Sequence, residues 1–313
     1  MPTQVAKPTN TQSLFPMSID YLKQKSYPGS AVTLEQTLVD SQAYKEYLAS
    51  YYSEGLKVYA LLGIPQGQSP SGGWPVILIN HGYIPPKLYS PTQSYRNIAD
   101  FFARSGYVVF MPSYRGNGDS QGEPTQVYVS EGYVIDSENA LSSIKQFPGV
   151  NSHKIGVFGH SMGGNITLHE LVIKNDFKAS VIWSGVVGSY SDILTWWQQR
   201  RETGVLITQN DQQTADLVDQ FFKIHKTPQT NPVFWNSIDP TNYLSNIQSP
   251  IEIDVGTNDS VVPVSFSETL RDKLLKLGKN VSFHLYDGAD HNLSPSQQEA
   301  LQTTISFFNT YLK

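Results

Sequence analysis

A serine set between glycines is the feature of this chain that most directly suggests covalent chemistry. The segment 159–164 (Gly-His-Ser-Met-Gly-Gly) follows the apolar run 154–158 and precedes a stretch with helical spacing. A Gly-x-Ser-x-Gly turn between a strand and a helix is typical of a nucleophile elbow, in which small neighbours let the two elements approach and the Ser161 hydroxyl stands clear of the sheet. An ordinary glycine-rich turn with a capping serine has the same pattern, so partners are needed elsewhere in the chain.

Two later segments provide a base and an acid for such a serine. Of the seven histidines, His291 is the one that follows the last expected strand, and Asp259 follows the strand expected at 251–255. Both would lie on loops at the carboxyl edge of the sheet, where Ser161 also lies, so that Asp259 would orient His291 and His291 would take the serine proton. The alternatives are a surface-loop histidine and an aspartate that caps a turn. Weaker candidates for the acid are Asp254, Asp287 and Asp290.

An oxyanion hole is expected where the strand 75–80 runs into His81, Gly82 and Tyr83. A glycine there allows the backbone to turn an N–H group towards the serine. The expected donors are the backbone N–H groups of Tyr83 and of Met162, the residue after the serine. The side chain of His81 is expected to be structural.

The order of these groups along the chain is serine, aspartate, histidine, as in α/β-hydrolases and unlike chymotrypsin or subtilisin. The sequence resembles the α/β-hydrolase superfamily, and within it the catalytic domain of the prolyl oligopeptidase-like (S9) peptidases and related serine esterases. The resemblance covers roughly residues 45–313 and implies the fold, the triad and hydrolysis through an acyl-enzyme. S9 peptidases usually carry a β-propeller ahead of this domain, and the preceding segment is too short for one, which favours a single-domain esterase. The segments that carry the resemblance are 80–83, 114–122, 159–164, 256–263 and 288–291.

Short apolar runs alternate with longer amphipathic stretches from residue 75 onwards, which predicts an α/β-hydrolase fold: a mostly parallel central sheet with helices on both faces. Residues 31–65 are expected to add antiparallel strands at its beginning. Residues 1–17 are expected to be a flexible N-terminal arm, and residues 18–313 one domain. The expected later strands are 75–80, 107–111, 154–158, 179–183, 251–255 and 280–286. The expected helices are 93–104, 129–147, one after Ser161, one ending near 277 and one ending near 312.

The alternation is interrupted at about 188–245, where helical and aromatic stretches predict a helical cap insertion rather than a structureless loop. The cap's aromatic residues are expected either to form its own small core or to line a substrate pocket. Those considered for substrate binding are Trp196, Trp197, Phe234 and Trp235. In the segment 114–122, Arg115 is expected to tie loops together beneath the site rather than to bind substrate.

Composition excludes several functions. The chain has 22 basic and 27 acidic residues, a net charge of -5, and no basic cluster, which argues against nucleic acid as a partner. The absence of cysteine excludes disulfides, thiolate metal sites and a cysteine nucleophile. The histidines are scattered without metal-binding spacing, so neither a metal nor another cofactor is expected. No apolar stretch reaches the length of a membrane span, and the pattern fits both a cytoplasmic protein and a secreted one whose leader has been removed.

The sequence therefore predicts a carboxylesterase, a serine carboxylic ester hydrolase that acts on small-molecule esters through Ser161, His291 and Asp259. The aromatic cap favours bulky or aromatic acyl groups, such as feruloyl-type esters or a polyester. The alternative is an S9-like exopeptidase or acylaminoacyl peptidase with the same triad, and a second alternative is a catalytically silent hydrolase fold that binds a ligand. Charged residues that would anchor a peptide terminus in the cap are Arg200, Arg201 and Glu202.

Overall fold

The computed structural model describes residues 15–125, 128, 130–203 and 219–313. Its strands are β1 (Thr33–Asp40), β2 (Tyr44–Ser53), β3 (Leu56–Pro65), β4 (Trp74–Asn80), β5 (Val108–Pro112), β6 (Val150–His160), β7 (Ala179–Trp183), β8 (Ile251–Gly256) and β9 (Val281–Tyr286). The α-helices are α1 (Ile19–Gln24), α2 (Arg96–Arg104), α3 (Gly132–Lys145), α4 (Met162–Ile173), α5 (Tyr190–Glu202), α7 (Pro232–Ile238), α8 (Val264–Lys276) and α9 (Gln297–Leu312). Two short 3-10 helices follow α7, η1 (Pro240–Asn242) and η2 (Leu244–Asn246).

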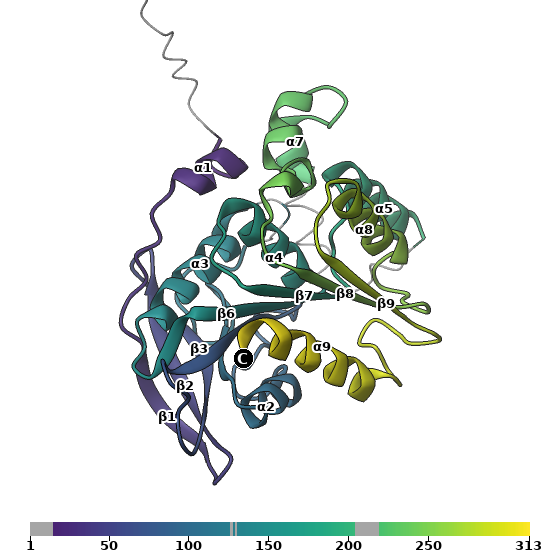
Figure 1. Ribbon diagram of the computed structural model, residues 1–313. Helices are drawn as coiled ribbons and strands as arrows, with labels where there is room; N and C mark the ends of the chain where they lie inside the picture. The colour runs from purple at the N-terminus through teal and green to yellow at the C-terminus, as the bar shows by residue number, and fades with distance from the viewer. Residues whose placement is uncertain (1–14, 126–127, 129, 204–218) are drawn as a thin grey trace, which may run out of the picture.

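One nine-stranded sheet, in the order β1-β2-β3-β5-β4-β6-β7-β8-β9, forms the centre of the molecule (Figure 1). β1, β2 and β3 pair antiparallel, and β3 also pairs antiparallel with β5. From β5 through β4 to β9 every pairing is parallel. The prediction of a mostly parallel sheet that begins with antiparallel strands is confirmed.

Helices cover both faces of this sheet, as Figure 1 shows. On one face α2 and α9 pack through residues such as Phe102 and Phe308, and on the other α3, α4 and α8 pack through residues such as Leu141 and Leu270. The strands β4, β5 and β7 are therefore buried from both sides, which is why they are mostly apolar in the sequence. The carboxyl ends of the parallel strands meet at one edge, and the loops that follow them are free to carry side chains for chemistry.

The described part of the chain before β1, from residue 15 onwards, packs on the domain. α1 contacts α4, and the ring of Phe15 meets that of Phe234 in α7 edge-on at 5.1 Å. Met17 also packs against the aromatic cluster around Phe234. Residues 1–14 of the predicted arm lie outside the described residues, whereas residues 15–17 contact the domain.

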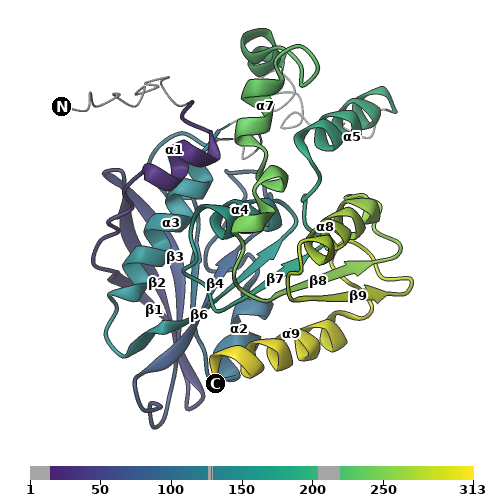
Figure 2. The same cartoon turned by 45° about the horizontal axis from the view of Figure 1, so that its top comes forward.

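The segment 188–245, which we call the helical insertion, follows β7 and contains α5, a helix at 219–225, α7, η1 and part of η2. Its described part contains no strand; residues 204–218, which the prediction also assigned to the cap, lie outside the described residues. In Figure 2, α5 and α7 stand out from the body of the molecule on the same side. Among the helices of the described chain, none is long and apolar enough to cross a membrane.

Two carboxyl groups are buried side by side on β8. Glu252 and Asp254 lie two residues apart on the same face of the strand, and both are almost fully buried. Glu252 accepts a hydrogen bond from Thr304, and Asp254 accepts one from Tyr286. Burial raises the pKa of Glu252 to about 7 and raises the pKa of Asp254 further above its ordinary value.

This burial predicts a stability that depends on pH. The folded state keeps protons that the unfolded chain releases near pH 4.5, so the free energy of unfolding falls as pH rises from there to about 7. Glu252→Gln removes one of the two acids while keeping its shape, so the variant lacks the part of this loss that is due to Glu252. We therefore expect the difference between the Tm of the variant and that of the natural protein to rise from about pH 5 to about pH 8. Each kcal/mol recovered corresponds to roughly 2–4 °C. Thermal unfolding at the two pH values measures this, and an equal Tm difference at both would contradict it.

Candidate active site

Ser161 lies at a sharp turn between β6 and α4. Its φ of 56° and ψ of -119° are unusual for a residue other than glycine. The neighbouring glycines allow this turn, because a Cβ on Gly163 would collide with the carbonyl oxygen of Asn80 and a Cβ on Gly159 would collide with Thr167. The close approach of β4, β6 and α4 thus holds Ser161 in a strained conformation. This is the geometry of a nucleophile elbow.

His291 reaches this serine from the loop after β9. Its Nε2 atom lies 2.9 Å from the Ser161 Oγ atom. The loop is shaped by Asp290, whose carboxylate accepts hydrogen bonds from the backbone N–H groups of Asn292 at 2.8 Å and Ser294 at 2.9 Å. A Cβ on Gly256 would collide with the Ala289 carbonyl, so glycine at the end of β8 is what lets this loop lie so close to the sheet.

Asp259 stands behind the histidine, on the loop after β8. Its Oδ2 atom lies 2.8 Å from His291 Nδ1, and its Oδ1 atom accepts from the backbone N–H groups of Val261 at 2.8 Å and Val262 at 2.9 Å. Burial by itself would raise the pKa of Asp259, but the hydrogen bonds from His291 and the two backbone groups outweigh it and hold the pKa below its ordinary value. An ionised Asp259 requires the proton of His291 on Nδ1, which leaves Nε2 free to accept from Ser161.

The three competing acids have other partners. Asp254 accepts from the Tyr286 hydroxyl at 3.0 Å, and Asp287 accepts from the Thr257 hydroxyl at 3.3 Å. The carboxylate of Asp290 is used within the histidine loop. The structure therefore brings Asp259, and not these three, to His291.

Both expected oxyanion donors belong to segments beside Ser161. A Cβ on Gly82 would lie 3.1 Å from the Cβ of Ser161, so the loop after β4 touches the serine. The Gly82 carbonyl oxygen accepts from His81 Nδ1 at 2.7 Å, and in a trans peptide the N–H of Tyr83 must point the opposite way. Met162 is the first residue of α4, where backbone N–H groups have no partner within the helix.

The side chain of His81 is structural, as expected. It is fully buried and stacks on Tyr89 with ring centroids 4.3 Å apart. Burial lowers the pKa of His81 to about 4, so the ring is neutral and carries its proton on Nδ1 for the Gly82 carbonyl. Arg115 also has the structural role expected of it, because its guanidinium binds Asp136 at 2.8 Å and Glu54 at 2.9 Å.

The sequence did not single out the side chains of His160 and Tyr95. His160 occupies the variable position before the serine, and its Nε2 atom lies 3.0 Å from the backbone oxygen of His291. Its Nδ1 atom meets the hydroxyl of Tyr95, the residue that precedes α2. No spacing along the chain connects residues 95, 160 and 291, so only the structure reveals that they meet.

The aromatic residues of the helical insertion separate into two groups. Phe234 and Trp235 are buried in the insertion's own core with Phe221, so their side chains do not form an open pocket wall, contrary to one of the two expectations. Trp196 packs edge-on against Phe266 of α8 at 6.0 Å. Of the four residues considered for substrate binding, Trp197 is the one that lines a described cavity.

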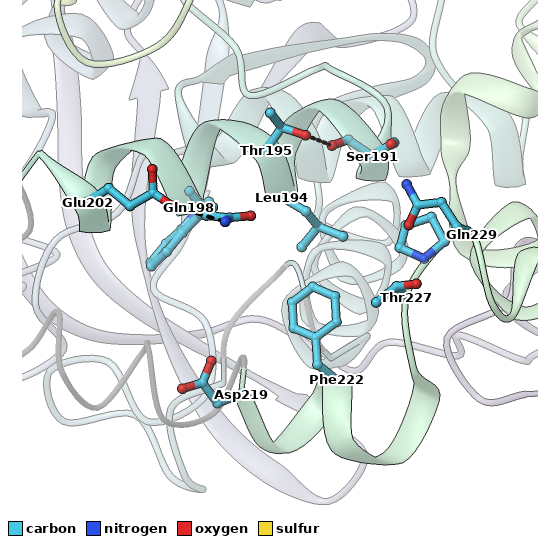
Figure 3. A pocket seen from close by; sticks show the side chains of 11 residues that line it. Ser191, Leu194, Thr195, Gln198, Glu202, Asp219, Phe222, Thr227 and Gln229 are labelled. Atoms are coloured by element: carbon cyan, nitrogen blue, oxygen red, sulfur yellow. Dashed lines mark hydrogen bonds between the residues drawn. The ribbon is translucent and has the colours of Figure 1, made fainter.

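That cavity has a volume of about 480 Å³ and lies between α5 and the segment 219–229. Figure 3 shows Leu194 and Phe222 facing each other across it, with Glu202 and Asp219 at one end. Its lining residues come from the insertion and include neither Ser161 nor His291. Among the described residues, no group of three His, Asp or Glu side chains is arranged to hold a metal ion.

Two similar proteins come from Bacillus subtilis. The chain is 26% identical to the uncharacterized peptidase YtmA over 265 residues, which is 83% of this chain and 91% of YtmA. It is 27% identical to the uncharacterized peptidase YuxL over 268 residues, which is 83% of this chain but 38% of YuxL. The chain thus has about the length of YtmA and corresponds to well under half of YuxL.

Solved structures of both esterases and peptidases share the fold. Acetyl xylan esterase 1 from Thermoanaerobacterium superposes with a TM-score of 0.66 at 16% identity, covering 94% of this chain and 91% of the esterase. The acylaminoacyl peptidase of Pyrococcus horikoshii superposes with a TM-score of 0.67 at 21% identity, covering 87% of this chain and 42% of the peptidase. At these identities the likeness establishes the fold alone.

Family membership follows from a match over most of the sequence. Residues 58–312 fit the sequence model of the dienelactone hydrolase family, from β3 to the end of α9. The expected resemblance to α/β-hydrolases, with S9 peptidases and esterases as structural neighbours, is confirmed. The chain belongs to the dienelactone hydrolase family and is an α/β-hydrolase.

Proposed function

We propose that this hydrolase is a serine carboxylesterase in which Ser161, His291 and Asp259 form the catalytic triad. The observation that carries the proposal is the continuous line of hydrogen bonds from Ser161 Oγ through the two ring nitrogens of His291 to Asp259, at 2.9 and 2.8 Å. A buried carboxylate, an oriented imidazole and a serine on a strained turn are the parts that acyl transfer requires.

In the acylation step, Ser161 Oγ attacks the ester carbonyl carbon while its proton passes to His291 Nε2. The carbonyl oxygen becomes an oxyanion, which accepts hydrogen bonds from the backbone N–H groups of Tyr83 and Met162. When the C–O bond to the alcohol breaks, the proton on Nε2 passes to the departing alkoxide. Asp259 stays ionised and stabilises the imidazolium that exists between these two proton transfers.

Deacylation repeats the same steps with water. His291 takes a proton from a water molecule as that water attacks the acyl carbon, and the same two N–H groups hold the second oxyanion. Collapse of the intermediate breaks the bond to Ser161 Oγ, which receives the proton from Nε2. The carboxylic acid leaves, and the site returns to its starting state.

The helical insertion acts, in this proposal, as a cap on the domain formed by residues 18–313. Trp197 supports a preference for bulky or aromatic acyl groups, such as feruloyl-type esters or a polyester, because its side chain lines the cavity together with Leu194 and Phe222. Aromatic walls bind planar groups through contact area and ring stacking.

Trp197→Ala tests this role of the cap. We expect kcat/KM for a feruloyl or naphthoyl ester to fall by about tenfold, since removal of one large apolar contact costs about 1–3 kcal/mol of binding. Turnover of p-nitrophenyl acetate, which has no bulky acyl group for Trp197 to contact, serves as the control within the same variant and should not change. Equal losses on both substrates, or on neither, would contradict the assignment.

The esterase proposal itself is tested by initial rates on p-nitrophenyl esters from acetyl to aromatic acyl groups, measured beside aminoacyl p-nitroanilides. Ester turnover with negligible anilide cleavage is the expected result.

The second candidate is a peptidase, which the similarity to YtmA favours. Arg200 also favours it as a charged anchor for a peptide terminus, because its guanidinium lies over the Trp196 ring and reaches the carbonyl oxygens of Ser260 and Val261, beside Asp259. Anilide turnover of comparable efficiency would establish that candidate instead.

A further inference from the structure

A chain of hydrogen bonds connects three loops of the site. The backbone N–H of Gly82, on the loop after β4, lies 2.9 Å from the Tyr95 hydroxyl oxygen. The same hydroxyl meets His160 Nδ1, next to the serine. On its other side, His160 Nε2 lies 3.0 Å from the backbone oxygen of His291. Thus Tyr95 and His160 join the oxyanion loop, the serine turn and the histidine loop.

The chemistry of the partners fixes the direction of every bond. A carbonyl oxygen only accepts, so His160 carries a proton on Nε2 and donates it to His291. Burial is the main cause that lowers the pKa of His160 to about 4, and the charge of the nearby His291 is the second cause. The ring is therefore neutral, so its Nδ1 atom has no proton and accepts. The Tyr95 hydroxyl therefore donates to Nδ1 while its oxygen accepts from Gly82. Reversing any one of these hydrogen bonds would leave two donors or two acceptors facing each other.

The location of Tyr95 adds to this evidence. It has a left-handed backbone with φ of 57°, just before α2, and its ring lies 5.6 Å from that of His160. A Cβ on Gly82 would lie 2.5 Å from the Tyr95 oxygen, so the hydroxyl fills the space beside that glycine. The surrounding fold thus holds Tyr95 in an uncommon backbone conformation that brings its hydroxyl to both Gly82 and His160.

We propose that Tyr95, acting through Gly82 and His160, is a positioning residue that holds the oxyanion donor of Tyr83 and the ring of His291 in register with Ser161. The proposal rests on the proposed esterase function. Tyr95 holds the N–H of Gly82 and His81 holds its carbonyl, so the two peptide groups that flank Gly82 are both fixed. The N–H of Tyr83, which shares a peptide with that carbonyl, therefore has its direction set before substrate binds. Such preorganisation matters most when the oxyanion forms, and little for binding of the neutral ester.

Tyr95→Phe removes the hydroxyl and keeps the ring. We expect kcat for p-nitrophenyl acetate to fall by about tenfold to a hundredfold with KM little changed, which is the cost of a small displacement of reacting groups. The rate at which a fluorophosphonate labels Ser161 should fall by a similar factor, because that reaction uses the same donors. His160→Phe, which keeps a ring but loses both the acceptor for Tyr95 and the donor for the His291 carbonyl, should act in the same direction.

The matched control is Tyr107→Phe. Tyr107 is buried, whereas Tyr95 is partly buried, and the Tyr107 hydroxyl donates to Asn309 at 2.8 Å, at the opposite end of the strands from the site. Tyr107→Phe loses one hydrogen bond and Tyr95→Phe loses two, so both should lower Tm, but only Tyr95→Phe should lower kcat. Natural kcat in Tyr95→Phe, or an equal loss in Tyr107→Phe, would overturn the inference while leaving the esterase standing. If the natural protein neither hydrolyses esters nor reacts with the fluorophosphonate, both proposals fail.

Discussion

Replacement of Ser161 by alanine will lower ester turnover by roughly six powers of ten, the loss that follows when a triad nucleophile is removed. The reason is that Ser161 Oγ lies 2.9 Å from His291 Nε2 on a turn that presents no other nucleophile to that ring. What remains is turnover due to binding and the oxyanion donors alone. Alanine has a Cβ as serine does, so the strained backbone angles at position 161 cost the variant about as much free energy as they cost the natural protein. The fold should therefore be retained with little change in Tm.

The measurement is kcat on p-nitrophenyl acetate together with the intact mass after fluorophosphonate treatment. The natural protein should gain one adduct and Ser161→Ala none. Ser180→Ala is the matched control, because Ser180 is buried near the beginning of β7 and hydrogen-bonds Ser249, away from the carboxyl edge of the sheet. An adduct on Ser161→Ala, or substantial turnover by it, would show that another residue is the nucleophile.

Asp259→Asn will lower kcat by about four powers of ten without loss of shape. In the natural protein Oδ1 of Asp259 accepts from the N–H groups of Val261 and Val262, and Oδ2 faces His291 Nδ1. An asparagine must keep its oxygen towards the two backbone donors, so its NH₂ group faces the histidine. The ring of His291 then has to accept at Nδ1 and carry its proton on Nε2, the atom that should take the proton of Ser161.

Rate measurements across pH on this variant, beside Asp287→Asn, check the assignment of the acid. Asp287 is an aspartate on the neighbouring loop that accepts from Thr257 and makes no contact with the histidine ring, so its variant should keep activity close to natural. The loss in Asp259→Asn should persist at high pH, since the neutral ring keeps its one remaining proton on Nε2 throughout the accessible range. Comparable losses in both variants would mean that a general change in the loops, and not the tautomer of His291, limits the rate.

The sequence predicted most of the fold because the decisive strands are buried on both faces. β4 and β7 are mostly apolar, β8 alternates apolar residues with the buried Glu252 and Asp254, and the limits of all three strands were predicted to within one residue. The edges were predicted less well, since exposed chain has a weaker pattern. β6 begins at Val150 rather than 154, α2 begins at Arg96 rather than 93, and α1 was not anticipated. A six-residue helix has too few turns to show a hydrophobic period.

The residues of the candidate site were predictable because parallel topology collects loops at one edge. Ser161, Asp259 and His291 each follow a strand directly, so the alternation of elements already implied that they meet. The sequence already favoured Asp259 over Asp290, which is adjacent to His291 in the chain and was considered the weaker candidate. The backbone N–H groups of the histidine loop bind the Asp290 carboxylate, and that is a property of the folded loop.

The sequence by itself determined the α/β architecture, the order of the candidate triad and the position of the helical insertion, since each of these depends on local pattern and on the order of segments. Only the tertiary structure decided that Phe234 and Trp235 are buried while Trp197 lines a cavity, and that Tyr95 joins Gly82 to His160 and His291. The physical reason is that such features depend on how whole elements pack. Packing decides which face of a helix is buried, and it brings together Tyr95 and His160, which are 65 positions apart in the chain, and His160 and His291, which are 131 positions apart. No spacing along the chain encodes that packing.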